Sequence, residues 1–427
     1  MTDREMIESR SPGSITFLRD KLITFEAWFF TQRRIRFYGS GVVVAYAIGL
    51  AERAFWHIWL FQENGQPSCI DFTTMWVSGI FAGSSDPARM YDDSAWAAAW
   101  KSLTGLEGCS YAQGHTSYPP LLLFFTYPLG LMPYISAFAV WTMVTLLLYL
   151  VAIYLIVPRP IAILAALSPF VVFFNFVLGQ NGFLLAGLMG LSLALMERRP
   201  QLSGILLALL TFKPQIGVLF PFALLVSRKW RVIVSAAATS VVLTVTSMVV
   251  FGYQGWPSFI HALADRGPSL APRLTSVYGF LLLAGISPSI AWATQLAVAG
   301  AVTAVVCWVW ARPLPHSLKS AALCSAAAMA TPYVHGYDLC VLAIAVAFLV
   351  KDGLTRGFLP GDRLIMLFSW IVIFLGFHYS SIGWIPCLTL LALVVRRMPD
   401  CSRIEFPRWC RISSLLLSRA DRSSRHQ

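Results

Sequence analysis

Charged residues are scarce in this chain of 427 residues. They make up 12% of the sequence, whereas hydrophobic residues make up 57%. Soluble domains carry about 25% charged residues, so the composition excludes an ordinary soluble protein. A membrane crossing needs roughly 20 mostly apolar residues. Runs of about that length are Gly41–Leu60, Ile135–Val157, Ile161–Leu178, Val232–Phe251 and Ala291–Ala311.

The chain also lacks the motifs of several other protein classes. Its first 38 residues are polar and basic, without the short apolar core of a cleaved signal peptide, so we expect the first crossing to be an uncleaved anchor. No Walker motif, nucleophile elbow or zincin signature is present, which argues against soluble nucleotide chemistry. The seven histidines and eight cysteines show no metal-ligand spacing, so we predict no metal and no cofactor.

Basic residues exceed acidic ones by twelve, a balance that nucleic-acid-binding proteins share. Here, however, the basic residues cluster at the ends of the apolar runs. The clusters are Arg33–Arg36, Arg198–Arg199, Arg228–Arg231, Lys351–Arg363 and Arg396 onward. This is the distribution of cytoplasmic loops under the positive-inside rule. We therefore expect membrane lipids, and no nucleic acid, as partners.

Placing the basic clusters inside predicts an all-α polytopic membrane protein with about 11–13 transmembrane helices. Residues 1–38 would form a basic cytoplasmic segment, residues 39–395 the transmembrane domain, and residues 396–427 a basic, disordered cytoplasmic tail. The first crossing would span residues 39–61.

Residues 62–117 are predicted to form a long first loop on the outer face. Two short amphipathic helices are expected in it, near Phe72–Phe81 and Asp92–Leu103. Cys69 and Cys109 would share this loop, so they could form a disulfide, although sequence cannot supply the geometry.

Two apolar stretches are too short or too interrupted for ordinary crossings. Tyr118–Pro133 is short and bounded by prolines, which favours a re-entrant segment. Between Arg199 and Arg228, Lys213-Pro214 interrupts the apolar run, which favours a hairpin of two half-length helices. Non-helical backbone at membrane depth is tolerated only beside protein or a water-filled cavity. The break at Lys213 therefore predicts a cavity.

Two charged residues are the leading functional candidates. Asp71 opens the amphipathic segment after the first crossing and is either a helix N-cap, which backbone N–H groups and the helix dipole would stabilise, or a reactive carboxylate. Lys213 either binds an anion such as a lipid phosphate or snorkels from a helix end.

Polar residues at three outer tips would line the mouth of one cavity, although each alone is more typical of a loop polar group. They are His115 and Tyr118, Gln180 and Asn181, and His335, Tyr337 and Asp338.

Several motifs occur in a fixed order over roughly residues 40–395. They are Asp71, Gly83–Pro87, Met90–Asp92, Tyr118–Leu121 with Pro128–Leu129, Gly179–Asn181, Leu210–Pro214, Arg228–Arg231, and Thr331–Tyr333 ahead of Tyr337–Asp338. In this order they resemble the bacterial membrane glycosyltransferases of family 87, which have the GT-C fold. Phe212 departs from the leucine that the family often shows, and the tail beyond Arg396 has no counterpart.

The resemblance implies an inverting enzyme in the bacterial inner membrane, with its active site facing the periplasm. It would move a hexose, by default mannose, from a polyprenyl-phosphate donor to a lipid or glycan acceptor. Asp71 matches the first-loop aspartate that acts as general base in the family.

The expected chemistry assigns the remaining residues. One carboxylate deprotonates the acceptor hydroxyl, and cationic groups hold the leaving phosphate. Lys213, with Arg266 or Arg273, would bind that phosphate. Substrate-binding candidates are Trp76, His115, Tyr118, Gln180, Asn181, Gln215, His335, Tyr337 and Asp338.

Two alternatives stand beside glycosyl transfer. A lipid or polyol transporter, or a flippase, would also explain broken helices and a polar cavity, although no internal repeat is evident. A membrane acyltransferase would use a buried histidine, such as His335 or His57, as its base.

Overall fold

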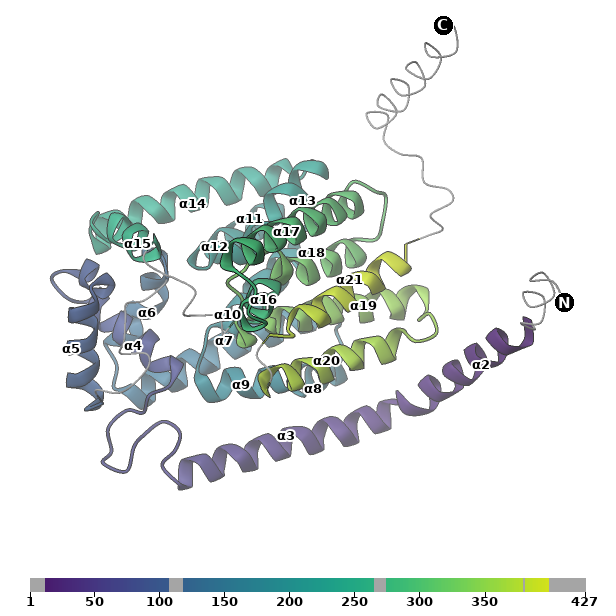
Figure 1. The fold of residues 1–427 in the computed structure, drawn as a ribbon, viewed down its shortest axis with the longest axis horizontal. Coiled ribbons are helices and arrows are strands. Elements are labelled where there is room, and N and C mark those ends of the chain that lie inside the picture. Colours follow the sequence, from purple (N-terminus) through teal and green to yellow (C-terminus); the bar gives the residue numbers. More distant parts are fainter. Residues whose placement is uncertain (1–11, 107–117, 265–273, 379–380, 399–427) are drawn as a thin grey trace, which may run out of the picture.

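The computed structural model describes residues 12–106, 118–264, 274–378 and 381–398, and these fold into helices joined by turns and loops (Figure 1). No strand occurs in those four ranges; pairing is limited to two isolated β-bridges. The all-α prediction is therefore confirmed. Long helices α2 (Pro12–Phe29) and α3 (Gln32–Phe55) run end to end along one side of the bundle.

Helix α3 corresponds to the first predicted crossing but is shifted toward the N-terminus. Thr31 caps its start by accepting the Arg34 N–H, and the helix ends before Trp56. It touches the bundle mainly through α8, where a Cβ on Gly39 would lie 3.0 Å from Leu164 Cγ. Large apolar side chains such as Phe37 are exposed elsewhere on α3. Lipid tails are as apolar as these side chains, so contact with lipid costs no free energy, whereas exposure to water would.

The first loop contains the two short helices expected from its amphipathic pattern. They are α4 (Asp71–Ala82) and α5 (Asp93–Thr104), joined through η1 (Pro87–Tyr91). Asp92 caps α5 by accepting the Ala95 N–H at 2.7 Å. Cys69 is disulfide-bonded, and Cys109 lies outside the described residues.

The proline-bounded stretch after the first loop folds as η2 (Pro120–Leu122) and α6 (Leu123–Gly130). Helix α6 crosses α4 at very close range, because a Cβ on Gly79 would lie 2.1 Å from the Thr126 carbonyl oxygen. Eight residues of helix span about 12 Å, too little to cross a bilayer. The stretch is therefore not an ordinary crossing.

Three helices are long and apolar enough to cross a membrane: α7 (Tyr134–Ile156), α14 (Trp230–Phe251) and α17 (Pro288–Trp310). The predicted crossing at 161–178 folds as a pair of helices, α8 (Pro160–Leu167) and α9 (Phe170–Leu178), bent by 68°. Pro169 stands at the bend, where a proline cannot continue the helical hydrogen bonds. The pair makes a fourth span if counted as one.

The chain is thus an all-α membrane protein, and the total of about 11–13 crossings stays a prediction. Other apolar helices are shorter. The remaining elements are α10 (Gly182–Leu195), α11 (Pro200–Leu209), η3 (Leu210–Phe212), α12 (Pro214–Gly217), α13 (Phe220–Val226), α15 (Gly255–Ala264), α16 (Val277–Leu283), α18 (His316–Ala330), η5 (Gly336–Cys340), α19 (Val341–Arg356), α20 (Asp362–His378) and α21 (Trp384–Arg396).

The core of the bundle surrounds α10, which is buried from Gly182 to Leu193. It packs against α7 and α19, and α18 packs against α17, α19 and α21. Small residues permit this closeness: a Cβ on Gly187 would lie 2.9 Å from the Tyr149 backbone nitrogen of α7. Close backbone approach of this kind is typical of helix packing in membranes.

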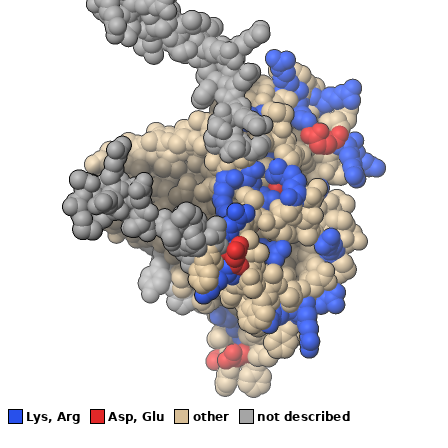
Figure 2. All heavy atoms as spheres, turned by 90° about the vertical axis from the view of Figure 1, so that its right-hand side faces the viewer, with Lys and Arg blue, Asp and Glu red and all other residues tan. Residues whose placement is uncertain are grey.

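Basic clusters distant in sequence lie together at one end of the bundle, the basic end. Lys229 Nζ lies 2.6 Å from Glu197 Oε1, so the chain returns between Arg199 and Arg228 to the end from which it left. This agrees with the predicted hairpin. His316 Nδ1 lies 3.5 Å from the same Glu197 oxygen. Figure 2 faces this end and shows many Lys and Arg side chains with few acidic ones.

Arg396 and Arg397, assigned to the tail from sequence, instead complete α21 and its C-cap. Both form ion pairs within the bundle, so the folded part of the chain reaches beyond residue 395. The rest of the predicted tail, residues 399–427, lies outside the described residues.

Candidate active site

The site is built around the break between η3 and α12. Lys213 has φ −140° and ψ 67°, which is not helical, because the following Pro214 disfavours the helical conformation of its neighbour. Its side chain does not reach the surface, as a snorkelling lysine would: Lys213 is 2% exposed. An ammonium group held this far from water needs a compensating charge.

Asp338 supplies that charge. Its Oδ1 lies 2.6 Å from Lys213 Nζ, and both side chains are buried. Its other oxygen, Oδ2, accepts the His335 N–H at 3.0 Å. From the sequence we expect Lys213 to bind a lipid phosphate and Asp338 to bind substrate; in the structure the two side chains pair with each other.

Two tyrosines flank the ammonium group. Lys213 Nζ lies 4.8 Å from the ring centre of Tyr337 and 5.7 Å from that of Tyr118. The electron-rich ring faces attract a cation at such distances. The Tyr118 hydroxyl accepts a hydrogen bond from Asn181 Nδ2 at 2.7 Å, which fixes the ring.

Asp71 lies close enough to act electrostatically on both Lys213 and Tyr337. It is the first residue of α4 and is 6% exposed, while Ile70 takes the N-cap position. The N-cap interpretation of Asp71 therefore does not describe its place. Asp338 therefore pairs directly with the ammonium group of Lys213, and Asp71 is a second buried carboxylate that acts on it electrostatically.

The turn Gly179–Gly182 is wedged between the start of α4 and η5. Gly179 has φ 62°, and a Cβ there would lie 2.6 Å from Phe72 Cβ. A Cβ on Gly182 would lie 2.3 Å from the Tyr337 carbonyl oxygen. Any larger residue at either position would therefore clash, so both positions require glycine. The turn thus positions Asn181, which is fully buried and whose Oδ1 has no hydrogen-bond partner among the described residues.

Other predicted site residues are placed as follows. Gln180 is buried and its Oε1 accepts the Asn181 N–H at 2.9 Å. The His335 ring stacks on Tyr337 with centroids 5.2 Å apart. Trp76 donates its indole N–H to the Met132 carbonyl at 3.1 Å and packs against Tyr134. Gln215 is half-buried in α12.

Three predicted site residues, His115, Arg266 and Arg273, lie outside the described residues. Within the described ranges, no group of three or more His, Cys, Asp or Glu side chains could hold a metal ion.

Asn175, which is not among the residues predicted from the sequence, holds two parts of the site together. This fully buried residue donates from Nδ2 to the Tyr337 carbonyl at 2.9 Å, and its Oδ1 accepts the Gly182 N–H at 3.0 Å. The signal was present, because Asn175 is a lone amide in the apolar run of α9. A polar group in such a run calls for an internal partner.

A model described as glycosyltransferase family 87 matches residues 116–332. The match covers half of the sequence. The chain belongs to glycosyltransferase family 87. The predicted resemblance is confirmed, and this family 87 member is a membrane glycosyltransferase, an enzyme and not the transporter or flippase considered as an alternative.

The matched residues of this glycosyltransferase include Tyr118, Asn181 and Lys213, whereas Asp71 and Asp338 lie outside the match. No curated protein and no solved structure matches the chain.

Proposed function

We propose that this glycosyltransferase moves a hexose, by default mannose, from a polyprenyl-phosphate donor to a hydroxyl of a lipid or glycan acceptor. The observation that supports this best is the buried convergence of Asp71, Lys213 and Asp338 at a break in the helices. Charged groups are costly inside a membrane protein and usually mark a functional site. The transferase domain would comprise residues 39–395, extended to Arg397 by the end of α21 and its C-cap.

The reaction is a single displacement at the anomeric carbon. The acceptor oxygen attacks that carbon, the bond to the phosphate oxygen breaks, and polyprenyl phosphate leaves as an anion. Asp71 takes the proton of the acceptor hydroxyl as general base. Asp338 suits this role less, because its two oxygens already accept from Lys213 and from the His335 N–H.

Lys213 would help to stabilise charge on the leaving phosphate. Because Asp338 already neutralises it, further cations are needed, and we assign these to Arg266 and Arg273. Arg273 directly precedes Leu274, which forms an isolated bridge with His335 beside the ion pair.

Tyr118 provides a ring face near Lys213 for packing against a sugar, and Tyr337, whose ring is stacked with that of His335, borders the same ammonium group. Asn181 Oδ1, which lacks a partner in the described part of the chain, could accept a hydrogen bond from a sugar hydroxyl. The proposed substrate-binding set is that predicted from sequence, with Asn175 added as a positioning residue.

The arrangement of the elements supports an active site facing the periplasm of a bacterial inner membrane. Helices α4 and α5 lie at one end of the bundle and α2 reaches the other, where the basic side chains gather (Figures 1 and 2). Basic clusters favour the cytoplasmic side. The start of α4 would then open toward the outer leaflet.

The decisive experiment incubates the purified protein with a panel of polyprenyl-phosphate sugars and measures release of polyprenyl phosphate. We expect Asp71→Asn to lower turnover by about 10²–10⁴-fold, the usual worth of general-base assistance. Asp86→Asn is the matched control, since Asp86 caps η1 in the same loop and asparagine caps equally well. Near-normal turnover by Asp71→Asn would remove Asp71 from this role.

A further inference from the structure

A second site lies at the basic end of the bundle, away from Lys213. An open cavity of about 590 Å³ is lined by Arg19, Leu22, Pro360 and Arg396. Arg19 and Leu22 belong to α2, Pro360 to the turn between α19 and α20, and Arg396 ends α21. The cavity therefore has walls from both ends of the described chain.

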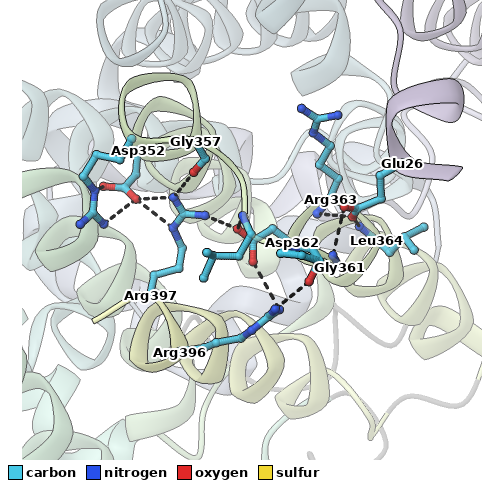
Figure 3. A network of polar contacts seen from close by, with 12 residues as sticks. Glu26, Asp352, Gly357, Gly361, Asp362, Arg363, Leu364, Arg396 and Arg397 are labelled. Carbon is cyan, nitrogen blue, oxygen red and sulfur yellow. Dashed lines mark hydrogen bonds and ion pairs between the residues drawn. The ribbon is translucent and has the colours of Figure 1, made fainter. Parts of the chain in front are cut away.

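Helix α2 forms one wall of this cavity, and Glu26 anchors the helix to the bundle. Glu26 is 4% exposed, and its carboxylate accepts the N–H groups of Gly361, Arg363 and Leu364 at 3.0, 3.0 and 3.1 Å (Figure 3). These N–H groups lie at the start of α20, where the helix dipole favours a negative charge. Both carboxylate oxygens of Glu26 are thus occupied, and its charge is compensated without Arg19 or Arg396.

The buried acids beside the cavity are also neutralised. Asp352 pairs with Arg356 at 2.7 Å and with Arg397 at 2.8 Å, and Arg397 also pairs with Asp362 (Figure 3). Both aspartates are 1% exposed. Two buried negative charges are therefore balanced by two arginines that do not line the cavity.

The two arginines of the cavity keep positive charge for a ligand. Arg396 is oriented by a 2.6 Å hydrogen bond to the Pro360 carbonyl, lies 3.5 Å from Asp362, and is 43% exposed. Arg19 is exposed and forms no ion pair with any described residue. Two guanidinium groups that face one cavity suit a phosphate, which they bind with several hydrogen bonds each.

The surroundings indicate a lipid as the source of that phosphate. Helix α2 exposes large aromatic side chains, such as Phe17 at 57% and Trp28 at 58%, beside basic ones. Lys21 lies 4.3 Å above the Phe17 ring, and Arg34 lies 3.5 Å above the Trp28 ring. Basic residues beside aromatic ones, here on α2 and at the start of α3, are typical of the membrane interface. Leu22 adds an apolar wall for the carbons next to a headgroup.

We propose that the cavity between α2 and α21 binds the headgroup phosphate of an anionic phospholipid. The site is separate from the transferase centre and does not depend on the function proposed for it. A phospholipid bound there would contact both α2 and α21 and so help to hold α2 against the end of the bundle.

The test measures binding of fluorescent phosphatidylglycerol to the purified full-length protein. Arg19→Gln/Arg396→Gln should weaken binding by about 10-fold or more, since each basic residue near an anionic surface contributes several-fold to affinity. The matched control is Arg231→Gln/Lys351→Gln, which removes two exposed charges from the same end but outside the cavity. Equal weakening by both pairs would show general surface attraction and overturn the site.

Two further arms complete the test. Fluorescent phosphatidylcholine should bind much more weakly, and inorganic phosphate or glycerol phosphate should compete poorly. Efficient competition by these soluble phosphates would overturn the assignment to a lipid. If the double variant does not fold, Arg19→Gln alone decides the matter, because Arg19 makes no ion pair with described residues; unchanged lipid affinity in that variant would contradict the proposal.

Discussion

Lys213 and Asp338 are buried charges whose stability depends on one another. Their atoms are 2.6 Å apart, and neither is exposed to water beyond 3%. Removing one member of such a pair leaves an uncompensated buried charge, which costs more than removing both. The pair therefore couples the folding of the break at Lys213 to the placement of η5.

We expect Lys213→Met to destabilise the protein by about 3–5 kcal/mol, because Asp338 would remain charged and buried. The double variant Lys213→Met/Asp338→Asn should recover much of that stability while turnover stays low. Thermal unfolding in detergent and release of polyprenyl phosphate measure the two effects. A double variant less stable than Lys213→Met would contradict the coupling.

His316 gives the basic end a pH dependence. Burial lowers the pKa of His316 below the usual 6.5. This effect outweighs the opposite effects of the hydrogen bond between Nε2 and the Leu193 carbonyl oxygen, at 2.7 Å, and of the nearby Glu197 carboxylate. The folded protein therefore holds a neutral ring where the unfolded chain binds a proton. Stability should fall as pH drops below about 6.5, by at most about 1.4 kcal/mol per pH unit.

The measurement compares unfolding between pH 7.5 and 5.5 for the wild type and for His316→Gln, whose slope should be smaller. His261→Gln, at an exposed position on α15, is the control and should keep the wild-type slope. A wild-type slope in His316→Gln would contradict the assignment.

At the scale of elements, the crossing of α4 and α6 positions the start of α4, and so Asp71. The two helices meet through Gly79 and Gly130, with backbone atoms where side chains would otherwise stand. Because such a contact cannot relax by moving a flexible side chain, any added atom must displace a helix.

Gly79→Ala should therefore lower both stability and turnover, stability by about 1–3 kcal/mol as for other overpacked sites. Gly83→Ala is a matched control one turn later, where the nearest atom to a new Cβ, Tyr127 Cε2, is at 3.5 Å. Unfolding and activity assays on both variants check this, and equal effects at the two glycines would refute it.

Patterns of neighbouring residues in the sequence predicted many of the helices and helix breaks. The amphipathic spacing gave α4 and α5, and Lys213-Pro214 gave the break. The bend at Pro169 was overlooked, although the proline was visible in the sequence. The Lys213–Asp338 pair could not be derived, because 125 residues separate its members and their meeting depends on how whole helices pack. The positions of α4 and η5 against the turn at Gly179 depend on the same packing.

At the scale of the whole molecule, Glu26 connects the first described helix with one of the last. Its three N–H partners stand 335 to 338 residues later in the chain. Such a contact tethers α2 to the bundle through a few charge-assisted hydrogen bonds, which are stronger than neutral ones.

Glu26→Gln keeps the shape of the side chain but removes its charge and one of its two acceptor oxygens. We expect α2 to detach more often, so that its amides exchange hydrogen at least about 10-fold faster, while those of α10 exchange as in the wild type. Hydrogen–deuterium exchange with mass spectrometry distinguishes the two helices. Unchanged protection of α2 would contradict the tether.

The Glu26 contact also orders events during synthesis. Helix α2 leaves the ribosome early, but the turn that receives its carboxylate is made only when most of the chain has been inserted. Until then the N-terminal helix has no docking place on its own protein. Its attachment is therefore a late step of maturation, and any product that stops before residue 361 would keep this helix undocked.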